Sequence, residues 1–472
     1  MKKFFLIGCA IVLFGCKKES NDTSKTIAKF SPEVEENAVI YEVNIRQYSP
    51  EGTFNAFTKD IPQLKELGVK IIWVMPIFPI SQTKRKATGG DKSKFASEMP
   101  AAEQHKYLGS YYAVSDFKKV NPEFGTIEDF RNLVKTAHEN GMYVILDWVP
   151  NHTGWDHVWI KDHPEYYTQN AKGEIIDPIN PETGKSWGWT DVADLNYDNK
   201  NLRTAMTADM MHWIKNENID GFRCDVAGNV PLDFWQQAIP QLRKEKNIFM
   251  LAEAWEPQLL KDGLFDMAYA WDGHHTLNKI AQGKEPVKSF DAYIEKINTD
   301  YEANDILMNF VDNHDENSWN GTIKSRLGAA EEAVTALTYV MPGMPLIYSG
   351  NEYGLEHSLK FFEKDSIPKT KGKQWELRAK LGKIKNELST LNGGKSKATY
   401  TRIKASNENV LAFERTKNGK KVIYLANLSS QPANVSLPIT GQYKDLMTGK
   451  PMGLNATQVY SMLPWQYYVL TK

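Results

Sequence analysis

The sequence predicts an α/β protein built mainly as a closed parallel (β/α)8 barrel, a TIM barrel, with a smaller β domain at its C-terminal end. Eight short apolar runs rich in β-forming residues alternate with longer amphipathic segments. The runs cover residues 39–45, 70–75, 142–148, 219–226, 248–254, 264–269, 306–311 and 345–348. Eight strand-then-helix units favour a closed barrel, although a doubly wound open sheet would show the same alternation.

The helical pattern is clear between the second and third of these runs. In residues 126–140 apolar side chains recur at helical spacing on one face, and Gly141 provides a stop signal. These apolar residues are Ile127, Phe130, Leu133, Val134 and Ala137. The segment therefore predicts an amphipathic helix that packs on the barrel.

The first residues are predicted to be a lipoprotein signal peptide rather than part of the fold. Met1-Lys2-Lys3 precedes an apolar stretch from Phe4 to Phe14, which is well short of the about 20 residues that span a bilayer. The stretch ends in Leu13-Phe14-Gly15-Cys16, which resembles a bacterial lipobox, so residues 1–15 would be removed and Cys16 would be acylated. An ordinary signal peptide with an incidental cysteine is the alternative.

The rest of the chain divides into a tether, a barrel with an insertion and a terminal domain. Polar residues 16–36 predict a lipid-linked tether, and residues 37–397 form the predicted barrel domain. Residues 153–200, rich in Pro, Gly, Asn and Trp, follow the third strand and far exceed a usual βα loop of about 2 to 6 residues, so they predict an inserted subdomain. Residues 398–472 contain strands separated by turn pairs such as Asn418-Gly419, which predicts an antiparallel β-sandwich.

Composition excludes several classes of protein. Hydrophobic residues make up 41% of the chain, which is typical of a soluble globular protein and rules out a disordered or collagen-like chain. The 57 basic and 58 acidic residues give a net charge of −1, which supplies no field to recruit nucleic acid. Of the three cysteines, Cys9 would leave with the signal peptide, Cys16 would carry lipid, and Cys224 is predicted to be a buried, inert thiol.

Polar and ionisable side chains gather at the ends of four predicted strands, where the active site of such a barrel lies. They are Asp147, Asn151 and His152 after the third strand, Arg223 and Asp225 on the fourth, Glu253 and Trp255 after the fifth, and His314 and Asp315 after the seventh. A lone Asp or Asn at a strand end is usually a turn former or helix cap. Convergence at four ends is poorly explained by packing, because burying ionisable groups is costly. Several carboxylates with an Arg and His, but without a Ser or Cys nucleophile, favour glycoside hydrolysis.

These four strand-end segments resemble the four signature regions of the α-amylase family, glycoside hydrolase family 13. Val192-Ala-Asp194-Leu195-Asn196 resembles the additional motif of the family's inserted domain B, and residues 110–116 and 121–126 also match. The resemblance covers nearly the whole chain beyond the predicted signal peptide. Together with the lipobox, it implies a bacterial lipoprotein of the α-amylase type with a barrel, a domain B and a C-terminal β domain.

The resemblance implies a role for each of three carboxylates. Asp225 would be the nucleophile that forms a β-linked glycosyl-enzyme, Glu253 the general acid and base, and Asp315 the group that stabilises the transition state. Arg223 shares a strand face with Asp225 and is expected to keep it ionised, whereas Glu253 must hold its proton, helped by the nearby Trp255. A retaining mechanism predicts about 5 to 5.5 Å between the carboxyl groups of Asp225 and Glu253.

Further residues would bind the sugar. The resemblance implies that His152 and His314 donate hydrogen bonds to sugar hydroxyl groups, that Tyr112 stacks under the ring, and that Asp147 supports Arg223. The set of substrate-binding residues is therefore Tyr112, Asp147, His152, Arg223, Trp255 and His314.

The resemblance also raises the question of calcium, although the chemistry itself needs no cofactor. Asn151 matches the family's calcium-ligand Asn, and Asp191 or Asp194 would add the oxygen ligands that structural Ca²⁺ requires. Asn151 as a hydrogen-bonding turn residue without a metal is the alternative. Many α-amylases carry a Lys-His pair shortly after the nucleophile, whereas this chain has Val226-Ala-Gly228-Asn229.

The implied function is a retaining glycoside hydrolase that cleaves α-glucosidic bonds, mainly α-1,4, in starch, maltodextrins or related α-glucans. The missing Lys-His pair keeps an exo-acting or α-1,6-cleaving enzyme open, and a transglycosylase of the same family is a further alternative. An alternative of another class is a non-catalytic surface glycan-binding protein on an amylase scaffold, which the three intact carboxylates disfavour. The expected partners are an α-glucan, a membrane through the lipid anchor at the cell envelope, either the outer membrane or the cell surface, and outer-membrane glycan-uptake proteins.

Overall fold

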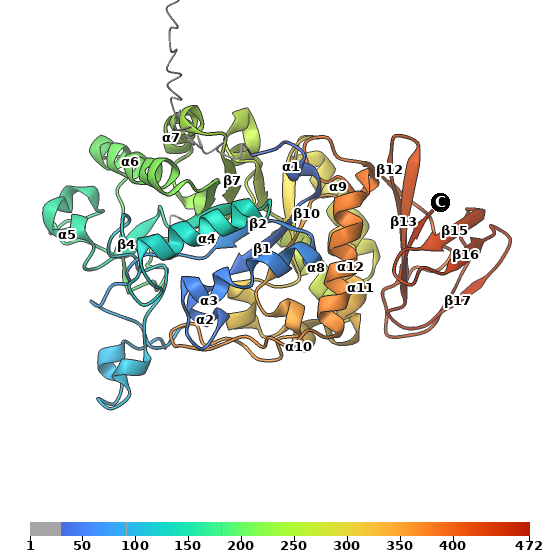
Figure 1. Cartoon of the computed structure of the whole chain (residues 1–472), viewed down its shortest axis with the longest axis horizontal. Coiled ribbons are helices and arrows are strands. Elements are labelled where there is room, and N and C mark those ends of the chain that lie inside the picture. The colour runs from blue at the N-terminus through green and yellow to red at the C-terminus, as the bar shows by residue number, and fades with distance from the viewer. Residues whose placement is uncertain (1–29, 91, 181) are drawn as a thin grey trace, which may run out of the picture.

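The structure, a computed structural model, describes residues 30–90, 92–180 and 182–472 of the chain (Figure 1). The predicted signal peptide, Cys16 and most of the predicted tether lie outside the described residues. Within those ranges, no helix combines the length and the apolar character that crossing a membrane requires.

Eight parallel strands close into a barrel. They are β1 (Val39–Val43), β2 (Val69–Val74), β3 (Tyr143–Trp148), β6 (Gly221–Cys224), β7 (Phe249–Ala252), β8 (Met267–Tyr269), β9 (Ile306–Asn309) and β10 (Met344–Tyr348). Their order around the barrel is β1-β10-β9-β8-β7-β6-β3-β2, and β1 pairs with both β2 and β10. Each strand falls in one of the eight apolar runs, so the barrel prediction is confirmed and the open sheet is excluded.

Side chains alternate between two buried layers along the barrel strands. On β1, Ile40 belongs to the cluster inside the barrel, whereas Val39 and Tyr41 pack in the layer between strands and helices. Glu42 follows Ile40 by two residues and therefore shares the interior face, where it is fully buried. Burial on both faces explains why these strands have continuous apolar sequences rather than alternating ones.

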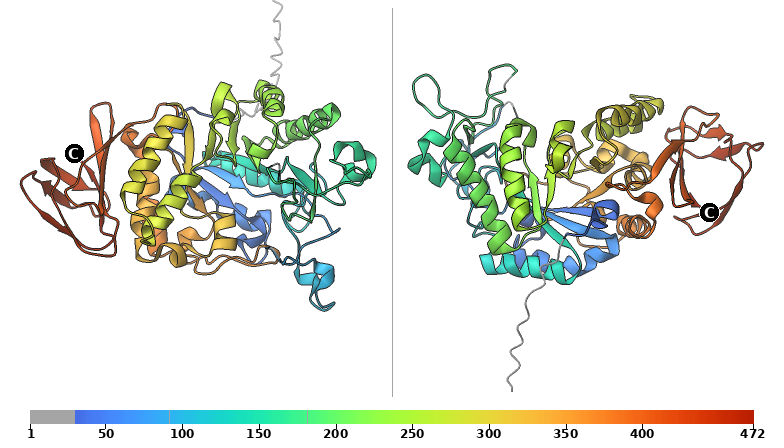
Figure 2. Two further views of the ribbon diagram at one scale, coloured as in Figure 1. Left: turned by 180° about the vertical axis from the view of Figure 1, so that it is seen from behind. Right: turned by 90° about the horizontal axis from the view of Figure 1, so that it is seen from above.

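Helices surround the barrel, as both views in Figure 2 show. The long ones are α4 (Ile127–Glu139), α6 (Lys200–Glu217), α7 (Leu232–Glu245), α8 (Trp271–Ala281), α9 (Lys288–Asp300), α11 (Glu331–Val340) and α12 (Lys373–Glu387). Shorter helices are α1 (Val34–Asn37), α2 (Ile45–Tyr48), α3 (Phe54–Thr58), α5 (Val158–Asp162) and α10 (Ile323–Leu327). Single 3₁₀ segments are η1 (Ile61–Leu67), η2 (Ala96–Glu98), η3 (Gln104–Lys106), η4 (Pro164–Tyr166), η5 (Ala227–Asn229), η6 (Pro257–Gly263), η8 (Gly328–Ala330), η9 (Asn351–Tyr353) and η10 (Ser389–Leu391), and η7 (Glu316–Asn320) is a π-helical turn.

Helix α4 matches the predicted amphipathic segment closely. Its first turn is closed by a capping box, in which the Asp129 backbone N–H donates to Thr126 Oγ1 and the Thr126 backbone N–H donates to the Asp129 carboxylate. The helix ends before Gly141, whose φ of 73° lies in the left-handed region that glycine tolerates. Its buried face contains Phe130, Leu133, Val134 and Ala137.

The chain between β3 and α6 forms an inserted region beside the strand ends. Its strand β4 (His152–Gly154) pairs in antiparallel fashion with β5 (Val192–Asp194), and His152 lies opposite Asp194. Helix α5 and a short 3₁₀ turn pack next to this pair (Figure 1). The insertion therefore begins directly where β3 leaves the barrel, which places it over the site described below.

The C-terminal domain lies beside the barrel, at one end of the molecule in Figure 1. Its six-stranded antiparallel sheet has the order β11-β12-β13-β18-β15-β16, and β14 pairs with β17. The strands are β11 (Thr399–Arg402), β12 (Val410–Lys417), β13 (Lys420–Asn427), β14 (Ala433–Val435), β15 (Gly441–Asp445), β16 (Pro451–Leu454), β17 (Tyr460–Met462) and β18 (Tyr467–Thr471). Asn418 and Gly419, both with positive φ, form the tight turn between β12 and β13. Buried Arg415 ties this domain to the barrel by donating to the carbonyl oxygen of Val340 at 2.8 Å.

Candidate active site

The predicted catalytic residues converge on one cavity at the C-terminal ends of the barrel strands. Its volume is about 590 Å³. Six of the residues predicted to be catalytic or substrate-binding line it: Tyr112, His152, Asp225, Glu253, His314 and Asp315. Asp147 and Arg223 lie directly beneath, fully buried at the ends of β3 and β6.

Arg223 is the centre of the site because three carboxylates surround it. Its Nη1 lies 2.8 Å from Asp147 Oδ1 and 2.9 Å from Asp225 Oδ1. Its Nη2 forms an ion pair with Glu253 Oε2 at 2.9 Å, and its Nε donates to the Tyr269 hydroxyl at 3.2 Å. These charges raise the pKa of Arg223 well above its usual range despite complete burial. A buried cation is stable only when it is paired in this way.

The pKa values of the two carboxyl groups that would perform the chemistry shift in the reverse of the predicted order. Burial and the neighbouring Glu253 raise the pKa of Asp225 well above its usual range. Burial also acts to raise the pKa of Glu253, but Arg223 and the Val226 backbone N–H outweigh it and leave that pKa lowered. The reason is that Arg223 reaches Glu253 as closely as Asp225, which the strand-face argument did not foresee.

The backbone next to Asp225 is strained. Val226 has a φ of 43°, a conformation that is rare for a β-branched residue. Its N–H donates to Glu253 Oε2 at 2.8 Å. The strained turn thus fixes the orientation of the Glu253 carboxylate relative to Asp225.

His314 joins a relay of polar groups that ends at Arg223. Its Nδ1 lies 2.5 Å from Glu42 Oε1, and its Nε2 lies 2.8 Å from the Tyr112 hydroxyl, which donates to Asp147 Oδ2 at 3.2 Å. Burial lowers the pKa of His314, but Asp315 and Glu42 outweigh it and raise the pKa to about 9. Both ring nitrogens of His314 therefore carry protons at neutral pH.

Glu42 is a site residue that the sequence argument missed. It lies on β1, within the first apolar run, and its other carboxylate oxygen, Oε2, has no hydrogen-bond partner although it is buried. An acidic residue inside an otherwise apolar barrel strand is the signal that would have identified it, because such a charge must find a partner.

Aromatic residues outside the predicted set of substrate-binding residues form much of the cavity wall. They are Trp189 on the insertion, Trp319 on the π-helical turn after Asp315, and Phe361 and Phe362 after β10. Trp319 Nε1 donates to Asp315 Oδ1 at 3.3 Å, and its ring packs on Phe361. Tyr112 stacks with His314, with ring centroids 5.6 Å apart. A wall of flat rings with a polar floor is suited to sugar rings, whose faces are apolar and whose edges carry hydroxyl groups.

His152 and Trp255 differ in how they relate to the cavity. Burial lowers the pKa of His152 to about 3, and the Asn151 amide donates to its Nδ1 at 3.2 Å, so its Nε2 carries the single proton. Trp255 is not among the residues that line the cavity, and it is 60% exposed. Strand β7 ends at Ala252, so the alternation that would have placed Trp255 on the face of Glu253 no longer applies.

The three residues predicted as calcium ligands line two different cavities. Asp191 lines the catalytic cavity and pairs with Lys86, whose Nζ lies 3.1 Å from Asp191 Oδ1. Asn151 and Asp194 instead line a second cavity of about 360 Å³ beside the insertion. Over the described residues, no group of three or more His, Cys, Asp or Glu side chains is placed to hold a metal ion. Ca²⁺ takes six to eight oxygen ligands, which include amide and backbone carbonyl oxygens as well as carboxylates, so the calcium site stays a prediction.

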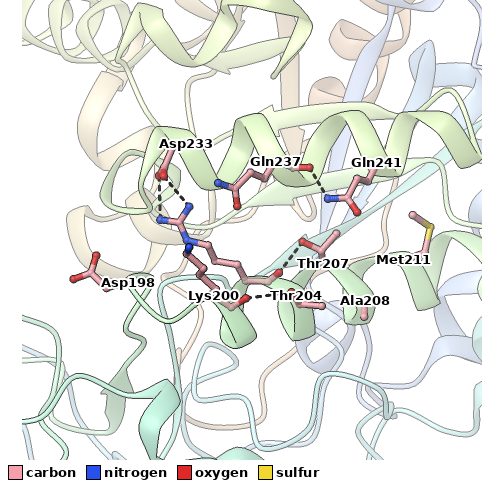
Figure 3. Close-up of a pocket in the computed structure, with 10 residues that line it drawn as sticks. Asp198, Lys200, Thr204, Thr207, Ala208, Met211, Asp233, Gln237 and Gln241 are labelled. Carbon is pink, nitrogen blue, oxygen red and sulfur yellow. Dashed lines mark hydrogen bonds and ion pairs between the residues drawn. The ribbon is translucent and has the colours of Figure 1, made fainter.

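A further cavity lies on the outside of the barrel between α6 and α7 (Figure 3). Its volume is about 540 Å³, and an ion pair between Arg203 Nη1 and Asp233 Oδ2 at 2.8 Å crosses it. None of the residues predicted to be functional lines it. The candidate chemistry is therefore confined to the strand-end cavity.

A parallel barrel with an acidic pair and a third carboxylate at its strand ends defines a glycosidase type of site. Comparison with known proteins gives the family. Residues 18–390 match the α-amylase catalytic domain and residues 400–469 match the maltogenic amylase C-terminal domain, so the chain belongs to the α-amylase family.

Individual relatives agree with this family. The chain is 24% identical over 438 residues to the α-amylase MalA of Haloarcula japonica, which covers 90% of this chain and 60% of that protein. It is 28% identical over 341 residues to a 4-α-glucanotransferase of Thermotoga neapolitana, covering 65% of this chain and 68% of that protein. The first relatives are longer proteins, of which the chain spans 60%, 65% and 62%.

Two solved structures share the whole architecture. A noncanonic maltogenic α-amylase, AmyB from Thermotoga neapolitana, superposes with a TM-score of 0.80 at 26% identity, covering 92% of this chain and 98% of the other. An α-amylase from Lactobacillus plantarum superposes with a TM-score of 0.79 at 28% identity, covering 93% and 99%.

Proposed function

We propose that this protein is a retaining glycoside hydrolase that cleaves α-glucosidic bonds, mainly α-1,4, in starch, maltodextrins or related α-glucans. The observation that carries the proposal is that one buried cation, Arg223, contacts Asp147, Asp225 and Glu253 at 2.8, 2.9 and 2.9 Å. Membership of the α-amylase family supports it.

The reaction would proceed in two displacement steps. In the first, ionised Asp225 attacks the anomeric carbon while Glu253 protonates the glycosidic oxygen, so the C–O bond breaks and the leaving chain departs with that proton. In the second, Glu253 removes a proton from water, whose oxygen displaces Asp225 from the sugar and restores the original configuration. The chemistry needs no cofactor, because both proton transfers and the covalent bond are supplied by carboxyl groups.

The first step requires an ionised Asp225 and a protonated Glu253, which is the reverse of the directions in which their pKa values are shifted. A glycosidic oxygen bound beside Glu253 favours the protonated form of Glu253, because it offers that carboxyl group a hydrogen-bond acceptor. Arg223 then remains paired with ionised Asp225. His314 and Asp315 are placed to hold the sugar, since both line the cavity and lie 3.4 Å apart at Nε2 and Oδ2.

Incubation of the purified full chain with starch, maltoheptaose and pullulan tests this proposal. We expect the wild type to release reducing sugar. We expect Asp225→Asn and Glu253→Gln each to lower the rate of this release by several orders of magnitude. Both variants keep the size of the side chain, so their melting temperatures should stay close to that of the wild type. Absence of reducing sugar from every α-glucan would contradict the hydrolase, and it is the outcome expected of a non-catalytic glycan-binding protein.

A transglycosylase is the second candidate, because relatives of this chain include a 4-α-glucanotransferase and cyclomaltodextrin glucanotransferases. The aromatic wall of the cavity gives an acceptor sugar a surface to bind in place of water. Maltotriose distinguishes the two reactions. A hydrolase yields only shorter products, whereas a transglycosylase also yields chains longer than the substrate. The products from pullulan likewise show whether the enzyme cleaves α-1,6 bonds. The sizes of the oligosaccharides from starch distinguish exo from endo action.

We also propose that the protein is exported and anchored to a membrane of the cell envelope by lipid on Cys16. The support is the sequence of the N-terminal segment, with its two lysines, its short apolar stretch and Leu13-Phe14-Gly15-Cys16. Mass spectrometry of the mature N-terminal peptide is expected to find diacylglycerol on Cys16. In Cys16→Ser the protein should leave the membrane fraction. An unmodified cysteine would contradict the anchor, and capture of outer-membrane glycan-uptake proteins with the anchored chain would test the partner class.

A further inference from the structure

We propose that Arg326 is a positioning residue for the proposed reaction. It holds residues 311–321, which belong to the connection between β9 and α10, in the path that brings His314 and Asp315 into the catalytic cavity. Arg326 lies on α10 and does not line that cavity. The inference rests on the proposed function and adds to it a residue outside the cavity on which the rate depends.

Asp315 depends on its backbone for its position. Its side chain is 37% exposed; Oδ2 lies 3.4 Å from His314 Nε2, and Oδ1 accepts from Trp319 Nε1 at 3.3 Å. Both contacts are longer than a typical hydrogen bond of about 2.9 Å. The chain then enters the π-helical turn η7, a rare conformation that persists where its surroundings hold it. The place of the Asp315 carboxylate is therefore set by whatever fixes this segment.

The guanidinium group of Arg326 contacts the segment on both sides of His314 and Asp315. Before them, its Nη2 donates to Asp312 Oδ1 at 2.6 Å and its Nη1 donates to the carbonyl oxygen of Val311 at 2.9 Å. After them, its Nε donates to the carbonyl oxygen of residue 321 at 3.1 Å, and its Nη1 lies 3.7 Å from the carboxylate of residue 316. One planar group thus holds four points of the segment.

Two buried carboxylates flank the catalytic residues and make this contact necessary. Asp312 and Glu316 are each less than a tenth exposed. Asn351 also donates to Asp312 Oδ2 at 2.9 Å, and His274 Nε2 lies 3.1 Å from Glu316 Oε2. Burial raises the pKa of Asp312 to about 7, and Arg326 opposes this shift. Among the residues that the structure describes, Arg326 is the cation paired with Asp312, so its loss would leave a buried carboxylate that must move to find water.

Arg326 is itself held in place by α8. Its Nη1 donates to Asn278 Oδ1 at 3.2 Å, and Gln282 Nε2 donates to its carbonyl oxygen at 3.2 Å. A side chain fixed at its backbone and at its charged end is a rigid support for a neighbouring site. Lysine in its place would keep the charge but lose the planar group whose donors point in fixed directions.

Arg243 provides a matched control at the other end of the barrel. It also pairs with an aspartate, Asp266, at 2.9 Å and donates to two carbonyl oxygens, those of Ile248 and Leu264, at 2.7 and 2.8 Å. These partners precede β7 and β8, so they lie at the end of the barrel opposite to the catalytic cavity. Arg243→Lys should therefore cost stability of a similar kind without moving the catalytic residues.

Kinetics of the full chain purified in detergent give the first test. Arg326→Lys should lower kcat for maltoheptaose by about tenfold and leave KM within about threefold, because Asp315 would act on the transition state. The Ki of 1-deoxynojirimycin, whose cation resembles the charged sugar of the transition state, should rise by about tenfold. A smaller fraction of folded enzyme would lower kcat but leave Ki unchanged. Arg243→Lys should keep kcat and Ki within about twofold of the wild type.

Amide hydrogen exchange gives a second test that needs no substrate. Peptides from residues 311–321 should exchange about tenfold faster in Arg326→Lys than in the wild type, and at the wild-type rate in Arg243→Lys. If Arg326→Lys does not fold, Asp312→Ala takes its place in both tests. It removes one acceptor of Arg326 and leaves the guanidinium bound to both carbonyl oxygens, so the same changes are expected.

Unchanged exchange, or faster exchange with a normal kcat and Ki, would overturn the inference while leaving the proposed hydrolase in place. A lower kcat with an unchanged Ki, or an equal effect of Arg243→Lys, would also overturn it, because either result indicates a general loss of folded enzyme. If the wild type releases no sugar from any α-glucan, the proposed function fails, and exchange alone decides the inference. Faster exchange of residues 311–321 then supports the role of Arg326, and unchanged exchange contradicts it.

Discussion

Glu42 Oε1 lies 2.5 Å from His314 Nδ1, and both side chains are buried at the base of the active-site cavity. The two residues are 272 positions apart and come from β1 and from the loop after β9. This contact and the neighbouring Asp315 favour the charged form of His314, whose ring also contacts Tyr112.

Replacement of Glu42 by Gln should therefore change the pH dependence of the reaction. His314 also faces Asp315, Asp147 and Glu253, which favour its charged form, and Arg223, which opposes it. Its pKa of about 9 predicts that kcat/KM falls as the pH rises through 9, when the imidazolium loses its proton. In Glu42→Gln this fall should begin at a lower pH, since one of the two carboxylates nearest the ring is gone.

The same contact makes a stability prediction with a defined sign. The folded-state pKa of His314 is raised from 6.5 to about 9. The charged side chain therefore contributes fully to folding stability below pH 6.5, and this contribution is lost as the pH rises through 9. Melting temperatures between pH 6 and 9.5 should decline less in Glu42→Gln than in the wild type. A matched control is Glu352→Gln, which changes another fully buried glutamate that bonds Tyr41 instead. If kcat/KM and the melting temperature depended on pH in the same way in Glu42→Gln and in the wild type, the role of Glu42 would be contradicted.

Lys86 and Asp191 form the ion pair that fastens the insertion to the loop after β2. Both side chains are less than a tenth exposed, so removal of one partner leaves an unpaired buried charge, at a cost of about 3 to 5 kcal/mol. Lys86→Met should therefore lower the free energy of unfolding markedly. The double variant Lys86→Met/Asp191→Asn removes both charges and should recover more than half of the loss. A double variant as unstable as Lys86→Met would show that the pair is not the cause.

Removal of calcium is expected to have little effect. Asp191 is paired with Lys86, and it lines a different cavity from Asn151 and Asp194. The melting temperature in EDTA should stay within about 2 °C of that in millimolar CaCl2, because binding of a ligand to the folded state alone would raise it. A rise with calcium that Asp194→Asn abolishes would instead place a metal ion in the second cavity.

The barrel could be predicted from the sequence because its strands are buried on both faces and so are apolar throughout. The carboxylates could be predicted because they lie at the ends of such strands or within a few residues after them. The acidic side chain of Glu42 in an apolar strand was a signal, but its contact with His314, 272 positions away, could not be predicted from local sequence. Trp319 and Phe361 could not be predicted to line the cavity for a similar reason, because they lie on loops whose path depends on the rest of the fold.

The position of Trp255 and the order of the pKa values of the catalytic pair could not be predicted from local sequence patterns. Strand β7 stops at Ala252, and a two-residue alternation carries no information beyond a strand end. The order of the pKa values of Asp225 and Glu253 depends on the second terminal nitrogen of Arg223, which only the folded site positions.

The central claim is that Asp225 becomes covalently linked to the sugar. An activated fluorosugar, whose glycosyl-enzyme hydrolyses slowly, allows that species to accumulate. Digestion and mass spectrometry should find the mass of one sugar on the peptide that contains Asp225, and Asp225→Asn should remain unlabelled under the same conditions. A sugar attached to a different residue, or steady turnover of the reagent without any adduct, would contradict the account.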